Sequence, residues 1–257
     1  MPQPPQAALS NAEFSDERLN KMTERIKAIR EAEKKSHLEI YSAAKLFEKG
    51  SWLAKPVKTV MDLIPMLKEI NPVTVLDLGC GVGRNCIPLA RELSENNCKI
   101  DAVDILDFAI EELNTNSKNF GVENSMNSIV SSIDDFKIEP DRYDLIFAVS
   151  ALEHVSSEKV FIEKLYEIYE GLKPGGIVCL IANSEVNEID KSNNNRVDPQ
   201  FEVNMKTEEM LCCLNEVFKN AETLKVSVSE QNYDIPRESF VSALSTKVVT
   251  FVAQKVK

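Results

Sequence analysis

A glycine-rich turn preceded by an acid is the first feature of this chain that could do chemistry. An apolar, β-branched stretch runs into Asp77, and Gly79, Gly81 and Gly83 follow at alternate positions before a short amphipathic run. This order predicts a strand, a tight turn and a helix. Because glycine lacks a Cβ atom, the turn can take positive φ and approach a ligand, and the N–H groups that open the helix point to the same place. We therefore expect a ligand on this turn.

The glycine spacing and the charge before it restrict the kind of ligand. A dinucleotide pyrophosphate is seated by G-x-G-x-x-G, whereas this turn reads G-x-G-x-G. The carboxylate of Asp77 would repel a pyrophosphate and would suit a cationic ligand. A second acid, Asp104, stands 21 residues after Gly83 at the end of an expected strand. A carboxylate there can accept hydrogen bonds from both hydroxyls of a ribose, so the position is compatible with an adenosine-containing cofactor of more than one class.

The elements that must position these residues alternate along the chain. Repeated strand–helix units predict an α/β fold with a doubly wound, mostly parallel seven-stranded sheet, helices on both faces and right-handed crossovers. Ligands of such sheets bind beyond the carboxyl ends of the strands, the edge at which the acids fall. The polar stretch 183–202 is too long for a simple connection, so we expect a substrate loop or an insertion there. Expected strands cover 73–78, 99–104, 127–131, 141–149, 175–182, 222–230 and 247–253, and expected helices cover 57–70, 86–93, 105–116, 159–172 and a stretch from 207.

The residues before the first strand are expected to form a helical N-terminal extension. We assign residues 1–14 to a disordered tail, 15–56 to a helical cap and 57–257 to the main domain. Two successive helical stretches are expected in the cap, and charged positions such as Glu33 are expected on a solvated face. Three aromatic residues of the cap could close over the site as a lid or pack the cap onto the domain: Tyr41, Phe47 and Trp52.

Composition disfavours several classes of function. The chain has 257 residues, 43% of them hydrophobic, without the apolar run of about 20 residues that a membrane span needs and without a secretion signal at its start, which predicts a cytoplasmic protein. The formal net charge of −11 repels phosphate backbones, so we expect neither nucleic acid nor membrane as a partner. The six cysteines lie mostly in apolar elements and show no C-x-x-C spacing. They are expected to be reduced core thiols, and no metal is expected.

The downstream chain matches a known pattern in order. Over roughly residues 50–255 the chain resembles the class I S-adenosylmethionine-dependent methyltransferases. The resemblance implies S-adenosyl-L-methionine as cofactor, with S-adenosyl-L-homocysteine as product, and a seven-stranded Rossmann-like fold. The motifs that carry it are Asp77-x-Gly79-x-Gly81-x-Gly83, Asp104, Asp134, Glu153-His154 and Leu172-Lys173-Pro174-Gly175-Gly176.

The resemblance also implies roles for single residues. Asp77 would act through the turn on the ammonium end of the cofactor, and Asp104 would hold the ribose. The adenine would be held by Asp134 with Ile133, although a shift of register would give that role to Asp135. His154, after the fourth strand, would be either a general base or a structural residue. The implied cofactor contacts are Asp77, Gly79, Gly81, Gly83, Asp104, Ile105, Ile133, Asp134, Val149 and Trp52.

The sequence contains less information about the methyl acceptor than about the cofactor. Neither an N-P-P-Y or D-P-P-Y motif nor a Pro-Cys pair is present, which argues against methylation of nucleic-acid bases. Residues 52–56 and 81–85 are similar to the tellurite-resistance branch of the family, which implies a small soft acceptor: a chalcogen oxyanion, a thiol or another metabolite. We expect methyl transfer by direct in-line displacement. A protein or RNA acceptor, an NAD-dependent oxidoreductase and a non-catalytic cofactor-binding protein are the alternatives.

Overall fold

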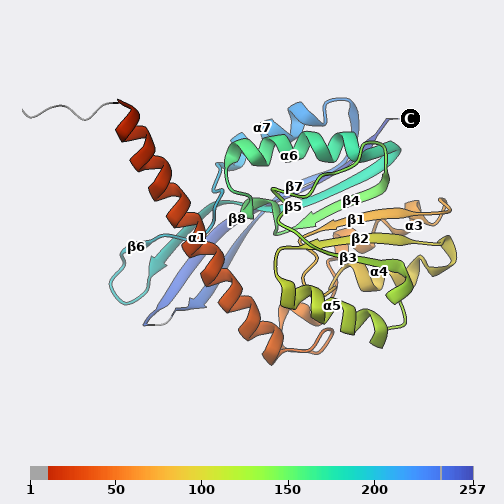
Figure 1. The fold of residues 1–257 in the computed structure, drawn as a ribbon, viewed down its shortest axis with the longest axis horizontal. Helices are drawn as coiled ribbons and strands as arrows, with labels where there is room; N and C mark the ends of the chain where they lie inside the picture. Colours follow the sequence, from red (N-terminus) through yellow and green to blue (C-terminus); the bar gives the residue numbers. More distant parts are fainter. Residues whose placement is uncertain (1–10, 238, 257) are drawn as a thin grey trace, which may run out of the picture.

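The protein is described by a computed structural model, which covers residues 11–237 and 239–256. Figure 1 shows a central twisted sheet between two sets of helices, with one long helix beside it. The strands lie in the order β3-β2-β1-β4-β5-β8-β7, and the short β6 pairs with β5. The strands are β1 (Thr74–Leu78), β2 (Lys99–Asp104), β3 (Met126–Val130), β4 (Tyr143–Val149), β5 (Leu172–Asp190), β6 (Arg196–Val197), β7 (Ala221–Pro236) and β8 (Val241–Lys255).

The sheet confirms the expected fold class. Strands β1 to β5 pair in parallel, and β8 runs antiparallel to both β5 and β7. The antiparallel end of the sheet is the feature by which class I methyltransferases differ from Rossmann dehydrogenases. The helices are α1 (Asn11–Ala43), α2 (Lys58–Met61), α3 (Ile64–Leu67), α4 (Cys86–Glu92), α5 (Asp107–Asn119), α6 (Glu158–Gly171) and α7 (Thr207–Val217).

The core forms on both faces of the sheet because consecutive residues of a strand point to opposite sides. In β4, Leu145 and Phe147 pack into one cluster with α4 and α5, whereas Ile146 and Ala148 pack into the other with α6 and α7. The central strands are therefore buried on both faces, as parallel strands usually are. No helix among the described residues is both long enough and apolar enough to cross a membrane.

Several elements differ from the expected boundaries. The two helical stretches of the cap form the single helix α1, since no glycine or proline interrupts residues 11–43. The helix expected over 57–70 is split into α2 and α3, with Pro65 in the first turn of α3, where it lacks an N–H to continue the preceding turn. The assignment of tail, cap and main domain stays a prediction, and residues 1–10 of the tail lie outside the described residues.

The strands β5, β7 and β8 are much longer than expected. Residues 183–190, which the sequence suggested were part of a loop or insertion, continue β5 and pair with β8. Together these strands extend the sheet beyond the carboxyl end of β4, and Figure 1 shows α1 running beside this extension. The site is therefore flanked by the strand ends, α1 and the extended strands.

Candidate cofactor and acceptor site

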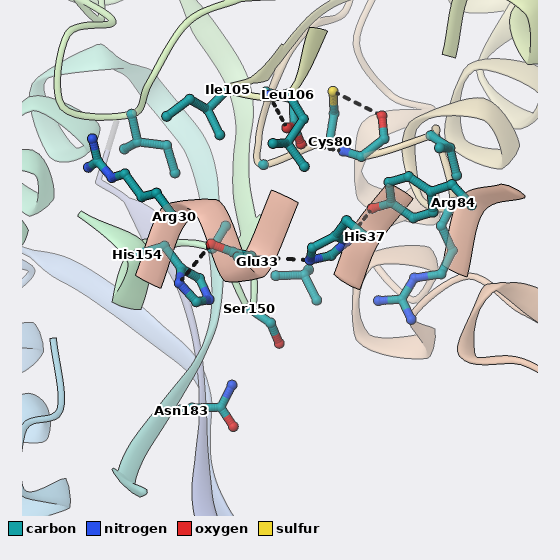
Figure 2. A pocket seen from close by; sticks show the side chains of 18 of the residues that line it. Arg30, Glu33, His37, Cys80, Arg84, Ile105, Leu106, Ser150, His154 and Asn183 are labelled. Atoms are coloured by element: carbon teal, nitrogen blue, oxygen red, sulfur yellow. Dashed lines mark hydrogen bonds and ion pairs between the residues drawn. The ribbon is translucent and has the colours of Figure 1, made fainter. Parts of the chain in front are cut away.

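A cavity of about 520 Å³ lies at the edge where β1, β2 and β4 end. Its walls come from the glycine turn after β1, the segments after β2, β3 and β4, the cavity face of α1 and residues 201–202. Figure 2 shows side chains from these separate segments pointing toward one space. Of the residues expected at the site, the cavity is lined by Trp52, Gly79, Gly81, Asp104, Ile105, Ile133, Asp134, Val149 and His154.

The glycine turn is tight enough to require glycine at two positions. Gly79 and Gly81 have φ values of +79° and +52°. A Cβ atom on Gly79 would lie 2.4 Å from the Cβ atom of Ala151, and one on Gly81 would lie 2.9 Å from the hydroxyl of Tyr41. The turn is thus enclosed between the segment after β4 and α1, and its backbone forms part of the cavity wall.

Asp77 and Gly83 lie behind this wall rather than in it. Asp77 is 2% exposed, and one of its carboxylate oxygens has no hydrogen-bond partner among the described residues. Burial raises the pKa of Asp77 well above its usual range, partly opposed by a hydrogen bond from the Cys86 thiol. Gly83 serves packing, because a Cβ atom there would lie 2.6 Å from a methyl group of Ile87. The action of Asp77 on a ligand through the turn and a direct contact from Gly83 therefore both stay predictions.

Asp104 joins the end of β2 to the glycine turn. One of its carboxylate oxygens accepts a hydrogen bond from the Gly81 N–H at 2.8 Å, and the other accepts one from the Leu106 N–H at 2.9 Å. Burial raises the pKa of Asp104, an effect that these two backbone donors oppose. Each oxygen keeps a further lone pair, so the carboxylate can still accept from a hydroxyl in the cavity. The next residue, Ile105, also lines the cavity.

The segment after β3 separates the two candidate adenine acids. Asp134 lines the cavity, and its carboxylate accepts hydrogen bonds from the Ser156 N–H at 2.9 Å and from Arg30 at 3.1 Å. Asp135 is exposed and accepts a hydrogen bond from the hydroxyl of Ser132 at 2.7 Å. This placement favours Asp134, next to Ile133, as the acid that faces a ligand.

Helix α1 supplies a cavity wall in which the sequence suggested only Tyr41, as one of the residues of a lid. Arg30, Glu33, His37 and Tyr41 line the cavity, and their spacing of three to four residues places them on one face of the helix. Figure 2 shows Glu33 and His37 on the helix turns that cross the cavity. The expectation that Glu33 belongs to a solvated face was therefore wrong. The spacing itself was a readable signal, but nothing in the sequence showed which surface this face would meet.

The aromatic residues of the cap divide between the two expected roles. Tyr41 and Trp52 line the cavity, with ring centroids 6.1 Å apart, and the Arg84 guanidinium lies 4.9 Å from the centroid of the Trp52 ring. Phe47 instead packs edge-on against Phe120, at a centroid distance of 5.3 Å, and attaches the cap to the domain. Tyr41 and Trp52 are thus in the position of a lid, whereas Phe47 is a packing residue.

His154, in the short 3-10 helix η4 (Leu152–His154), is held between two carboxylates. Its Nδ1 lies 3.0 Å from an oxygen of Glu202 and 3.5 Å from an oxygen of Glu33, and its ring stacks on Phe201. Burial lowers the pKa of His154, but the hydrogen bond to Glu202 and the charges of Glu33 and Glu153 raise it to about 9. The ring is therefore an imidazolium near neutral pH. In this arrangement it cannot accept a proton, which disfavours the general base.

Comparison with known proteins identifies the segment that carries the glycine turn. Residues 75–176 match the family model described as a methyltransferase domain. Residues 75–176 therefore carry a methyltransferase domain. This confirms the resemblance seen in the sequence, and the matched segment contains Asp77, Asp104, Asp134 and His154.

Relatives and solved structures agree with this assignment. The chain is 31% identical over 105 residues to a sterol 24-C-methyltransferase of Candida albicans, covering 40% of this chain and 26% of that one. It is 31% identical over 125 residues to a carboxy-S-adenosyl-L-methionine synthase of Shewanella halifaxensis, covering 48% and 49%. TehB from Haemophilus influenzae has the same fold, with a TM-score of 0.55 at 21% identity over 76% of this chain and 62% of that one. A geranyl diphosphate methyltransferase also shares the fold, with a TM-score of 0.53 at 14% identity over 77% and 85%.

These matches leave the acceptor side of the methyltransferase undefined. The chain spans about half or less of the length of the two curated relatives, and the family match ends at residue 176. Many cavity residues therefore lie outside the matched segment, among them those of α1, Trp52, Asn183, Phe201, Glu202 and Tyr233. Glu202 is a site residue that the sequence did not reveal, because it stands in a polar stretch with no motif around it.

Proposed function

We propose that this methyltransferase transfers a methyl group from S-adenosyl-L-methionine to a small-molecule acceptor by direct in-line displacement. The observation that carries the proposal is the pair of acids on the cavity wall, Asp104 beside the glycine turn and Asp134 after β3. They stand at the strand ends where the ribose and the adenine of this cofactor would be expected. An NAD-dependent oxidoreductase finds no support in the family match.

The residues present fit the cofactor at each of its ends. Asp104 would accept from the ribose hydroxyls, and Asp134 would accept from the adenine amino group beside the apolar Ile133. The backbone of Gly79 and Gly81 would lie against the methionine part, and the buried carboxylate of Asp77 would favour its ammonium through the turn. When bound, the cofactor supplies an electrophilic methyl group on a sulfonium.

The protein's own contribution is alignment and exclusion of water. Tyr41 lies against the glycine turn from the α1 side, and Trp52 lines the cavity beside Tyr41. Displacement at the methyl carbon requires the nucleophile to lie opposite the leaving sulfur. A cavity wall that fixes the cofactor and the acceptor in this geometry lowers the activation free energy of methyl transfer. This step forms no covalent bond to the protein and needs no metal at the cofactor.

The size and closure of the cavity support a small acceptor. One space of about 520 Å³ would have to hold both the cofactor and the acceptor, and α1 forms one of its walls. The formal net charge of −11 disfavours a polyanionic acceptor such as RNA. A thiol, a chalcogen oxyanion or another compact metabolite fits these limits better than a macromolecular acceptor does.

The first test is calorimetric titration with S-adenosyl-L-methionine, S-adenosyl-L-homocysteine and NAD. We expect binding of the two sulfur ligands and none of NAD. Asp134→Asn should weaken binding about 10- to 100-fold, since a charge-assisted hydrogen bond contributes about 1.5–3 kcal/mol. The neighbouring Asp135→Asn is the matched control and should leave binding unchanged, because Asp135 is exposed and does not line the cavity.

Turnover is tested separately, by measuring S-adenosyl-L-homocysteine formation with a panel of thiols and chalcogen oxyanions. Binding of NAD alone, or equal losses in the Asp134 and Asp135 variants, would contradict the cofactor assignment. Normal cofactor binding with turnover only on protein or RNA would contradict the small acceptor.

A further inference from the structure

Three side chains with metal-ligating atoms meet on the acceptor side of the cavity. Glu33 comes from α1, His154 from η4 after β4, and Glu202 from the segment between β6 and α7. One ligand atom from each lies within 4.8 Å of the other two. The three residues are far apart in the sequence, so only the fold brings them together, and Figure 2 shows two of them, Glu33 and His154, joined by a dashed line.

The two carboxylates are oriented in the same way toward the imidazole. The Oε2 atoms of Glu202 and Glu33 lie 3.0 and 3.5 Å from His154 Nδ1. The Oε1 atom of Glu202 faces Arg30 Nε at 3.5 Å, and the Oε1 atom of Glu33 faces His37 Nε2 at 3.6 Å. Each carboxylate thus directs one oxygen to the centre while an outer partner holds the other, which is how outer-shell groups orient metal ligands.

The positions and charges of the ligands suit a divalent cation. Metal–nitrogen and metal–oxygen bonds of about 2.1 Å place neighbouring ligand atoms roughly 3.0–3.5 Å apart, which matches the 3.0 and 3.5 Å that separate Nδ1 from the two oxygens. Arg30 also pairs with Asp134, so its charge is shared with a third acid. Two glutamates, one with a fully buried side chain, therefore leave a negative charge that a divalent ion would neutralise.

We infer that Glu33, His154 and Glu202 form a site for a divalent first-row metal ion. One imidazole with two carboxylates is a ligand set suited to Mn²⁺, Fe²⁺ or Zn²⁺. Binding displaces the proton on Nδ1 to solvent, so one proton is released for each ion bound and the three side chains change from a net charge of −1 to neutral with the ion. Because the ion would border the cavity, its open positions can take an oxygen of the methyl acceptor. This last step rests on the proposed function and favours, among the acceptors proposed there, those with an oxygen donor, such as a chalcogen oxyanion.

The test measures Mn²⁺ binding by electron paramagnetic resonance on the full chain after treatment with EDTA, without cofactor. We expect saturable binding of one Mn²⁺ per chain. Glu33→Gln and His154→Asn should each weaken it at least tenfold. Glu39→Gln is the matched control, because Glu39 is an exposed residue of the same helix, and it should bind Mn²⁺ like the wild type.

The outcomes separate the metal site from the cofactor site. Wild-type protein that shows no saturable Mn²⁺ binding at millimolar concentration, or variants that bind as tightly as wild type, would overturn the inference. S-adenosyl-L-homocysteine affinity, measured on the same samples, reports whether each variant is folded and whether the proposed cofactor assignment holds. Loss of cofactor binding with intact Mn²⁺ binding would therefore count against the proposed function and not against the metal site.

Discussion

Asp77 should make cofactor binding depend on pH. Its carboxyl group is 2% exposed, one oxygen has no partner among the described residues, and burial raises its pKa well above the usual range. A neutral carboxyl group is therefore favoured in the empty protein. The ammonium group of the cofactor, arriving on the other side of the glycine turn, favours the ionised form instead. Binding should thus release a proton from Asp77.

The sign and the magnitude follow from linkage. Because the pKa of Asp77 is higher in the empty protein than in the complex, affinity weakens as pH falls. Between the two pKa values, release of one proton changes the dissociation constant about tenfold per pH unit, or about 1.4 kcal/mol. Asp104, whose pKa burial also raises, would add a change of the same sign. Asp77→Asn removes the first contribution and keeps the second.

Calorimetry with S-adenosyl-L-homocysteine measures this proton directly. Titrations in two buffers of different ionisation enthalpy should give different binding enthalpies for the wild type, and a smaller difference for Asp77→Asn. Identical enthalpies in both buffers, together with a wild-type affinity that does not change between about pH 5 and 8, would refute the argument that the cofactor ionises Asp77 through the turn.

Two further predictions concern the glycine turn and the imidazole. Gly81→Ala should lower the affinity for S-adenosyl-L-homocysteine, because a φ of +52° costs alanine about 1 kcal/mol and the new Cβ atom would meet the Tyr41 hydroxyl. Adding Tyr41→Phe, which removes this hydroxyl, should restore part of the affinity. Calorimetry that shows no recovery in the double variant would contradict the contact. In metal-free protein, the His154 ring should titrate near the raised pKa of about 9 when followed by nuclear magnetic resonance. Its contribution to stability is complete below about pH 6.5 and lost as pH rises through 9; a midpoint near 6.5 would restore the general base as a candidate.

The sequence predicted the part of the site that lies within the strand–helix repeats. The glycine turn and Asp104 could be found because strand ends in such a sheet share one edge, so local motifs already imply their relative positions. The extension of β5 could not be found, because its buried side is partly polar. Glu188 is buried while the neighbouring Ile189 is 38% exposed, which inverts the pattern by which a half-buried strand is recognised.

That inverted pattern is stable because the buried acid is fully paired. Arg237 donates two hydrogen bonds to the carboxylate of Glu188, at 2.7 and 2.5 Å, and the hydroxyl of Ser242 donates a third. These partners come from the turn between β7 and β8 and from β8 itself. From the sequence alone, a charged residue at position 188 is expected to be exposed to solvent. The residues that donate hydrogen bonds to it are about 50 positions away in the sequence, so no local pattern shows that it is buried.

The attachment of α1 to the site also depends on residues that are far apart in the sequence, so the sequence did not predict it. Arg25 forms two hydrogen bonds of 2.8 Å with Asp198, and Arg30 reaches both Asp134 and Glu202. Since Asp134 is also the acid expected to accept from the adenine, a bound cofactor and Arg30 share one carboxylate. A ligand that binds Asp134 more strongly in one position of α1 than in another shifts α1 toward the position with the higher affinity. Because the coupling is reciprocal, the position of α1 changes the affinity for that ligand by the same factor. Under the proposed function, Asp134 would thus couple the cap to the cofactor, beside the contact of Tyr41 with the glycine turn, and α1 carries Glu33 and contacts Glu202 through Arg30.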